Sequence, residues 1–482
     1  MADLTNNAKK CTTPWWQAMV FASIAGGMGW GIRGQYGHET GAMIAGVLVS
    51  LTIVLLLCPR ASSISLARAV AWGTLAMGIG GTITYGQTVG LTQDAALIGN
   101  WDALRWGMLG LGIKGGLWIG FAGAFLGMGL SEVRYRAKEI FLLMLALIAV
   151  CFLGIFILNA PFDPANQILP RFYFSDAWFW EPDSMLEPRS EFWGGLLFAW
   201  LALFVYAGWI RKDRLARNLA MWGVLGGAIG FPLGQSIQAY HAWNHKMIDE
   251  TFLAKLQLNW WNMMETTFGA TMGAALGLGA WLNRELMNPP PEEEGNHFPM
   301  PLGFLLLACH LAMLIAVEFA TIRAVDMFYD LGLIMVLVPM VMSLRGRWWP
   351  YLQVLPLTMI PIAGKTVREL VYRENSIEVV PGWILYAVVP WSVGLIFAIW
   401  SGSSSRRQSH GHSFVRWSLL ITTWTYFGLN FAFFRFPWPW EEWTGRTASG
   451  LVFTFCTFVL TVLVMMKSKQ QSSDEAKAAT SQ

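Results

Sequence analysis

Long apolar blocks alternate with short polar or charged segments along almost the whole chain. Each block runs for roughly 18–25 residues, the length that crosses a hydrocarbon core of about 30 Å as an α-helix. A soluble protein with many core strands would carry shorter apolar runs, so the pattern predicts an all-α polytopic membrane protein. We predict about fourteen spans, at residues 15–33, 41–58, 66–86, 105–130, 139–158, 191–210, 217–238, 260–282, 301–321, 325–344, 347–364, 381–400, 414–434 and 446–466.

The predicted spans form two transmembrane bundles, at residues 15–282 and 301–466, joined by a polar linker over 283–300. The segment 1–14 lacks the pattern of a cleavable signal peptide, so we expect no removable leader. The tail at 467–482 is polar and of low complexity, and we expect it to be disordered.

Lys and Arg are concentrated in alternate loops. They follow the second, fourth and sixth predicted spans, for example at Arg134, Arg136 and Lys138, whereas the other loops hold most of the acidic residues. Because loops that stay in the cytoplasm carry the excess of Lys and Arg, we expect both termini in the cytoplasm. We expect the membrane to be the plasma (inner) membrane.

The longest loop on the side away from these basic residues covers 159–190 and clusters Phe, Tyr and Trp among polar residues. Amphipathic segments of this kind lie in membrane interfaces. An interfacial segment on the outer leaflet is therefore one interpretation of the loop, and a lid over an outward-facing cavity is the other.

Three segments align without gaps and each ends in Gly-Gln: AGGMGWGIRGQ (25–35), MGIGGTITYGQ (77–87) and LGGAIGFPLGQ (225–235). The helices that return after the last two carry glycines four residues apart, which lets neighbouring backbones approach closely. Chance similarity among Gly-rich helices is the competing explanation. We predict parallel repeats of a Gly-rich helical hairpin, at residues 15–58, 66–130 and 217–282.

Composition supports the membrane assignment and excludes several other classes. The chain has 482 residues, of which 55% are hydrophobic and 13% charged, whereas soluble domains carry about 25% charged residues. A net charge of +3 gives no reason to expect a nucleic-acid partner. The five cysteines show no metal-binding or disulfide spacing, and nucleotide-binding and protease motifs are absent. We expect no cofactor and no metal, the lipid bilayer as surrounding partner, and a chain that is free to form oligomers.

Polar and ionisable side chains are costly at membrane depth, so they face a cavity or one another. The predicted hairpins bring a set of them to one level, in the outer third of the membrane. A self-satisfied network that locks the hairpin tips is the alternative interpretation. The candidate binding residues are Arg33, Gln35, Gln87, Arg105, Lys114, Gln235, Gln238, His241 and Glu265.

Two cations stand out in this set. Arg33 is flanked by glycines that leave its guanidinium accessible, and this group matches a carboxylate or phosphate with two parallel hydrogen bonds. Its alternative role is an internal ion pair with Glu39 or Glu265. Lys114 lies roughly 14 Å inside its predicted span, at 1.5 Å per residue. A lysine at this depth needs a carboxylate partner, for which we predict Glu39 or Glu265.

Three functions fit these patterns. The first is a secondary transporter or facilitator of a small polar or anionic solute or lipid headgroup. The second is a membrane-embedded transferase with an outward-facing active site and a lipid-linked substrate, in which Glu39 or Glu265 is the general base, His38 a proton shuttle and Arg33 a phosphate clamp. The segment GIRGQYGHE (31–39) is similar to Gly/Arg-rich motifs of membrane transferases that act on lipids. The third is a non-catalytic scaffold subunit.

Overall fold

A computed structural model describes residues 13–34, 36–37, 39–58, 61–81, 85–176, 180–181, 187–290, 298–330, 336–346, 348–403, 411–434 and 442–479. Regular structure in these ranges is helical, apart from one isolated β-bridge between Asp163 and Ile168. The all-α prediction is therefore confirmed.

The helices of the first half are α1 (Trp15–Arg33), α2 (Glu39–Leu57), α3 (Ser63–Gly80), α4 (Gly86–Gln93), α5 (Trp101–Leu130), α6 (Ala137–Gly154), α7 (Trp193–Val205), α8 (Arg214–Trp243), α9 (His245–Asp249), α10 (Phe252–Lys255) and α11 (Trp260–Leu282). The helices of the second half are α12 (Met300–Phe319), α13 (Arg323–Asp330), α14 (Val338–Arg345), α15 (Trp349–Val354), α16 (Pro356–Val367), α17 (Val379–Trp383), α18 (Val389–Ser401), α20 (Gly411–Phe434) and α21 (Thr447–Ala479). Wider π-helical turns extend α6 to Asn159 and α7 to Ile210, and join α17 to α18.

Each predicted apolar block contains helix, but two blocks are interrupted. The block at 66–86 ends as α3 at Gly80, and the chain resumes as the short helix α4. In the block at 325–344, α13 and α14 lie on either side of residues that are not described. The block at 347–364 divides at Leu355, because the proline that follows has no N–H to donate and restricts the residue before it.

Seven helical segments of the described chain are long and apolar enough to cross a membrane: Thr40–Leu57, Trp101–Leu130, Ala137–Asn159, Trp193–Ile210, Met300–Phe319, Val379–Ser401 and Thr447–Lys467. The chain thus has the helices of a multi-pass membrane protein. Helix α1 is outside this set, because its glycines and tryptophans add little hydropathy. Most of its second half is buried against other helices, so it does not depend on lipid contact.

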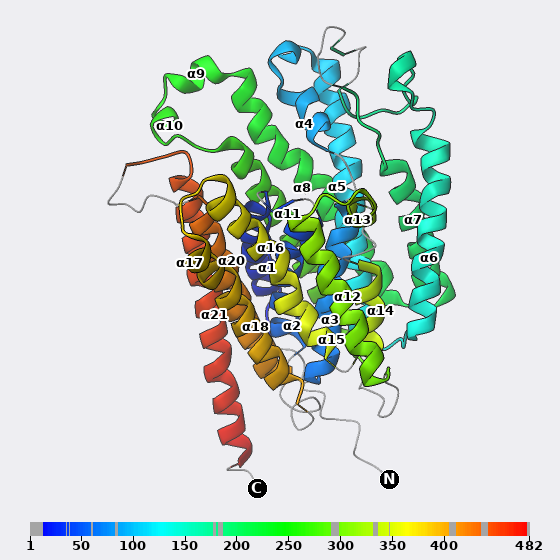
Figure 1. Ribbon diagram of the computed structural model, residues 1–482, viewed down its shortest axis with the longest axis vertical. Coiled ribbons are helices and arrows are strands. Elements are labelled where there is room, and N and C mark those ends of the chain that lie inside the picture. Colours follow the sequence, from blue (N-terminus) through cyan, green and yellow to red (C-terminus); the bar gives the residue numbers. More distant parts are fainter. Residues whose placement is uncertain are drawn as a thin grey trace.

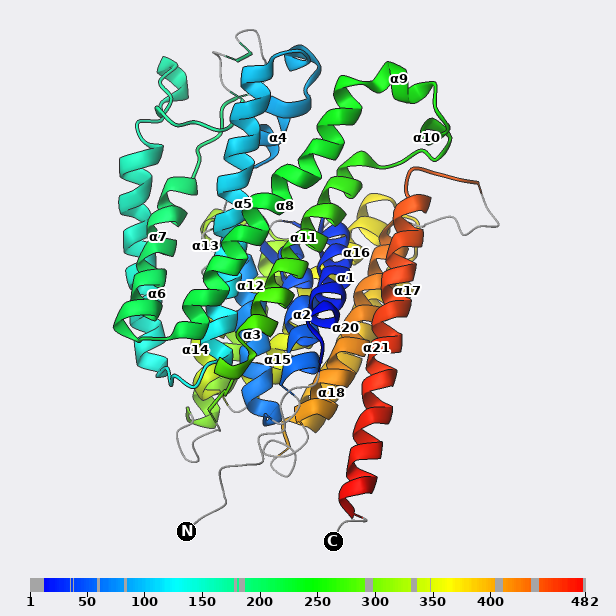
Figure 2. The same cartoon turned by 180° about the vertical axis from the view of Figure 1, so that it is seen from behind.

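Six helices of the first half form a closed ring, which we call the helix ring. Helix α1 packs against α2, α2 against α3, α3 against α5, α5 against α8, α8 against α11, and α11 against α1. Helices α6 and α7 lie at one edge of the molecule and α21 at the other (Figures 1 and 2). One hydrophobic core extends from Ala18 to Val464, so the two predicted bundles share a core.

Glycines allow the closest contacts within the helix ring. A Cβ on Gly227 of α8 would lie 2.0 Å from the carbonyl oxygen of Gly115 on α5. A Cβ on Gly26 of α1 would lie 2.2 Å from the carbonyl oxygen of Gly269 on α11. These backbones touch only because no side chain separates them, as is common between membrane helices.

The two ends of the bundle differ in character. Helices α4, α9 and α10 lie at one end, which we call the α4 end (Figure 1). The α5–α6 turn (131–136) and the α7–α8 turn (211–213) lie at the other end and carry arginines and a lysine, so we call it the basic end (Figure 2).

Helix α21 runs to the basic end and continues to Ala479 (Figure 1). Residues 468–479, for which we predict disorder, are described as a continuation of this helix. This stretch contains Lys, Gln, Ala and Glu, which favour helix, and it lacks Gly and Pro. The helix begun by the apolar block therefore meets no residue that would stop it.

Candidate functional site

Arg33 and Glu265 form a buried ion pair inside the helix ring. The Nη2 atom of Arg33 lies 3.1 Å from Oε1 of Glu265, and their side chains are 2% and 1% exposed. Arg33 also donates a hydrogen bond to the hydroxyl of Tyr85, the residue directly before α4. We call Arg33, Tyr85 and Glu265 the axial cluster. Glu265 is one of the two carboxylates predicted as an internal partner for Arg33, and that pairing is confirmed.

Local packing fixes the geometry of the axial cluster. A Cβ on Gly34 would lie 2.5 Å from Oε2 of Glu265, so the carboxylate in its present position packs directly against this glycine. The side-chain amide of Asn262 donates to the carbonyl oxygen of Gly31 over 2.8 Å. This bond holds the first turn of α11 against the last turns of α1, next to Glu265 in the second turn of α11 and Arg33 at the end of α1.

Aromatic rings from four helices fill the ring interior around the axial cluster. The ring of Trp30 lies 5.1 Å from that of Trp118 and 4.4 Å from that of Phe268, centroid to centroid. Phe231 stacks on Phe268 at 4.7 Å and meets Tyr85 at 5.2 Å. The Arg33 guanidinium lies 4.8 Å from the Trp30 ring centroid. The cation is therefore stabilised by ring faces as well as by its carboxylate.

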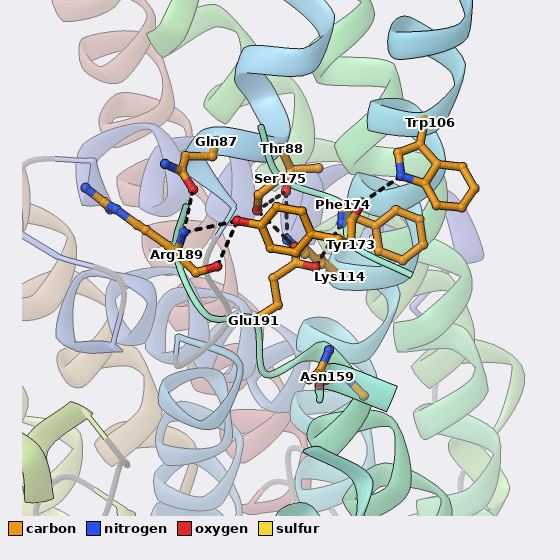
Figure 3. A network of polar contacts seen from close by, with 11 residues as sticks. Gln87, Thr88, Trp106, Lys114, Asn159, Tyr173, Phe174, Ser175, Arg189 and Glu191 are labelled. Atoms are coloured by element: carbon orange, nitrogen blue, oxygen red, sulfur yellow. Dashed lines mark hydrogen bonds and ion pairs between the residues drawn. The ribbon is translucent and has the colours of Figure 1, made fainter. Parts of the chain in front are cut away.

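Lys114 forms a second buried ion pair, with Glu191 (Figure 3). Its Nζ atom lies 2.6 Å from Oε1 of Glu191 and 2.7 Å from the hydroxyl oxygen of Thr88, and both charged side chains are 0% exposed. Glu191 also accepts hydrogen bonds from the backbone N–H of Phe174 at 2.8 Å and from the hydroxyl of Ser175 at 2.9 Å. Each charge thus has several polar partners. We call Lys114, Glu191, Thr88, Phe174 and Ser175 the lysine network.

The prediction of Glu265 as the partner of Lys114 is wrong, because the lysine pairs with Glu191. The side chain of Glu39, the other predicted partner, lies outside the described residues. Glu191 lies 77 positions further along the chain, at the first residue of the block predicted as span 191–210. Glu265 is already paired with Arg33. Only the folding of the loop before α7 over α5 brings Glu191 to the lysine, and the apolar pattern carries no signal for it.

The loop between α6 and α7 is tied onto α4 and α5 (Figure 3). The hydroxyl of Tyr173 donates to the carbonyl oxygen of Arg189 at 2.9 Å and accepts its backbone N–H at 3.0 Å. The amide of Gln87 donates to the carbonyl oxygen of Glu187, and the indole of Trp106 donates to that of Tyr173. The described part of the loop covers the lysine network.

Three carboxyl groups meet at the α4 end. The side chains of Asp94, Asp176 and Glu181 place carboxylate oxygens within 4.8 Å of one another, and Gly90 makes room, because a Cβ there would lie 2.5 Å from Asp94. Burial, with the nearby charges of Glu181 and Asp94, raises the pKa of Asp176 to about 8. These residues could hold a cation or share protons. In the sequence they stand out only as acidic loop residues.

Other candidate residues lie along the last turns of α8. The buried side chain of Gln235 donates to the hydroxyl of Thr92 over 2.8 Å. Gln238 is buried one turn further along α8. His241 stacks on Trp260 with ring centroids 4.4 Å apart. Gln87 and Gln235 align in the predicted repeat, but their surroundings differ. The interruption between α3 and α4 places Gln87 in α4, whereas Gln235 lies within the continuous helix α8.

The remaining candidates do not join these clusters in the described structure. Arg105 pairs with Asp102 at 3.5 Å, and both side chains are more than two-thirds exposed. Gln35 and His38 lie outside the described residues, and so does the side chain of Glu39. Arg105 is therefore a surface residue, one turn from the start of α5.

Searches for related proteins find no matching family model, no matching curated protein and no matching solved structure. The assignment of function therefore depends on the geometry of these clusters.

Proposed function

We propose that the protein is a secondary transporter of a small anionic or polar solute, with the axial cluster as its binding site. The observation that carries the proposal is the Arg33–Glu265 pair, which lies among aromatic rings inside the helix ring and has almost no exposure. Buried charges in membrane helices are expensive and mark substrate and ion pathways. Apolar side chains would serve a purely structural role at lower cost.

The chemistry of the pair suggests how a solute would bind. A solute carboxylate or phosphate can replace Glu265 on the Arg33 guanidinium, since both anions match its donors. Glu265 then takes up a proton, so one anion and one proton enter together and the site remains neutral. Tyr85 would donate to the bound anion from the break between α3 and α4. Broken helices with irregular backbone line the binding sites of many transporters, and α4 is the natural moving element here.

We propose that the chain crosses the plasma membrane about fourteen times with both termini in the cytoplasm, as the loop charges favour. The separation of the basic end from the α4 end supports this orientation. We further propose that the hairpins α1–α2, α3–α5 and α8–α11 are parallel repeats. Their helices follow one another around the helix ring in chain order, as repeats arranged about an axis would.

Uptake by proteoliposomes tests the proposal. The purified full chain is reconstituted and offered labelled carboxylates, phosphate esters and amino acids, with protein-free liposomes as the control. Accumulation of at least one solute supports transport. If a folded preparation moves none of them, transport is refuted and a scaffold role is favoured. If it instead turns over a lipid-linked donor, the transferase is the correct assignment.

A further inference from the structure

The three carboxyl groups at the α4 end come from two separate segments of the chain. Asp94 follows the last residue of α4 as its C-terminal cap. Asp176 and Glu181 belong to the loop between α6 and α7. Since carboxylate oxygens of all three lie within 4.8 Å of one another, we call these residues the carboxylate cluster.

Two members of the carboxylate cluster lie against the same glycine. A Cβ on Gly90 of α4 would lie 2.5 Å from Oδ2 of Asp94 and 2.8 Å from Oδ2 of Asp176. Two carboxylates this close repel each other unless a proton or a cation lies between them. The loop does not relieve this crowding, because Ser175, directly before Asp176, is held by its hydrogen bond to Glu191 at 2.9 Å (Figure 3).

Asp176 differs from the other buried carboxylates of the described chain. It is 4% exposed, and neither of its carboxylate oxygens has a donor outside the cluster. The other four buried carboxylates among the described residues all have donors: Lys114 for Glu191, Arg33 for Glu265, Ser131 and Tyr135 for Asp213, and Lys365 and Arg368 for Glu318. Because a buried charge without a partner is costly, Asp176 requires a positively charged partner or a proton.

We propose that the carboxylate cluster binds Ca²⁺. This ion takes oxygen ligands at about 2.3–2.6 Å in flexible geometry, and carboxylates can supply one or both oxygens. Ligand oxygens on opposite sides of the ion therefore lie up to about 5 Å apart, which agrees with the spacing of the cluster. Mg²⁺ is usually held by only one or two carboxylates. Zn²⁺ favours nitrogen and sulfur ligands, and the cluster consists of oxygen ligands alone.

Bound Ca²⁺ joins the C-terminal end of α4 to the loop between α6 and α7. The amide of Gln87, in the first turn of α4, already donates to the carbonyl oxygen of Glu187 in the same loop at 3.0 Å. The ion therefore fastens α4 to this loop at both ends of the helix. The sequence does not predict this ion, because Asp94 lies in a different loop from Asp176 and Glu181.

Calcium binding by the purified full chain in detergent tests the proposal, and it does not depend on whether the protein transports a solute. The protein is treated with EDTA and exchanged into chelator-free buffer, and CaCl₂ is added in isothermal titration calorimetry. The variants D176N and D94N each remove one ligand charge. D102N is the matched control, because Asp102 lies in the first turn of α5, has an 81% exposed side chain and is not part of the cluster.

We expect wild type to bind Ca²⁺ with a dissociation constant of about 1 mM or lower. Each cluster variant should weaken binding by about tenfold or more, and D102N by less than about twofold. CaCl₂ should also raise the unfolding temperature of wild type more than MgCl₂ does, and that of D176N little. D94N serves if D176N does not fold.

Three results would overturn the proposal. The first is that folded wild-type protein shows no saturable binding up to about 10 mM CaCl₂, beyond the range of weak calcium sites. The second is that D176N and D94N bind as tightly as wild type. The third is that D102N loses as much affinity as they do. An equal or larger stabilisation by MgCl₂ would overturn the choice of calcium as the ion.

Discussion

Removing one partner of the Lys114–Glu191 pair should destabilise the protein strongly and unequally. In E191Q, the Lys114 ammonium remains fully buried with the Thr88 hydroxyl as its remaining described partner from this network. Leaving one charge of a buried pair without its partner costs about 3–5 kcal/mol. In K114M, the Glu191 carboxylate keeps the donors from Phe174 and Ser175. The loss of stability in K114M should therefore be smaller, about 2–3 kcal/mol.

The double variant K114M/E191Q removes both charges at once. Its free energy of unfolding should lie close to that of K114M, because the neutral amide introduced by E191Q does not need a cation as its partner. The two single effects are then non-additive by about the whole effect of E191Q, about 3–5 kcal/mol. Exposed Arg105 provides the control, since R105Q should stay within about 0.5 kcal/mol of wild type.

Equilibrium unfolding in mixed micelles, followed by far-ultraviolet circular dichroism, measures these free energies. The reasoning fails if E191Q unfolds within about 0.5 kcal/mol of wild type. It also fails if the two single effects add, because the charges would then not depend on each other. A larger loss in K114M than in E191Q would contradict the donors assigned to Glu191.

Two further predictions concern the α4 end and the helix ring. The pKa of Asp176 is about 8 in the folded protein, against an ordinary 3.8. Between these two pH values the folded state therefore holds a proton that the unfolded chain has released. The stabilisation that this proton contributes should therefore be fully present below about pH 4 and be lost as the pH rises through about 8. In D176N the unfolding temperature should fall less between about pH 5 and pH 9 than it does in wild type. An unchanged pH profile would contradict the assignment. The variant G227A should lose about 1–3 kcal/mol of stability in the same micelle assay, because its new Cβ would meet the Gly115 carbonyl oxygen, whereas G303A, where a Cβ meets nothing within 4 Å, should stay near wild type.

The helices could be predicted from the sequence because each long apolar block forms a helix of about the same length. Helix α1 matches its predicted block at 15–33, and α11 matches 260–282. Interruptions were harder to predict. Proline explains the break at Leu355, but the gap between α3 and α4 follows a Gly-rich stretch with no residue that forbids helix.

Candidate residues were predictable where charge and depth coincide, and their partners were not. Arg33 and Lys114 stand out because ionisable groups are rare inside apolar blocks. Tyr85 and Glu191 sit at block edges, where polar residues are ordinary, and only tertiary packing brings them to the buried cations. Asp176 could not be separated from its neighbours for the same reason, since its burial depends on how the loop before α7 folds.

The central claim is that Arg33 binds the transported solute inside the helix ring. The most direct measurement is the initial rate of uptake, by proteoliposomes, of a solute that the wild-type protein moves, compared between wild type, R33Q and R105Q at equal amounts of folded protein. The account predicts that R33Q loses at least about tenfold in uptake, as expected for loss of a buried charged contact of about 1.4 kcal/mol or more, and that R105Q retains the wild-type rate. Equal uptake by R33Q and wild type would contradict it.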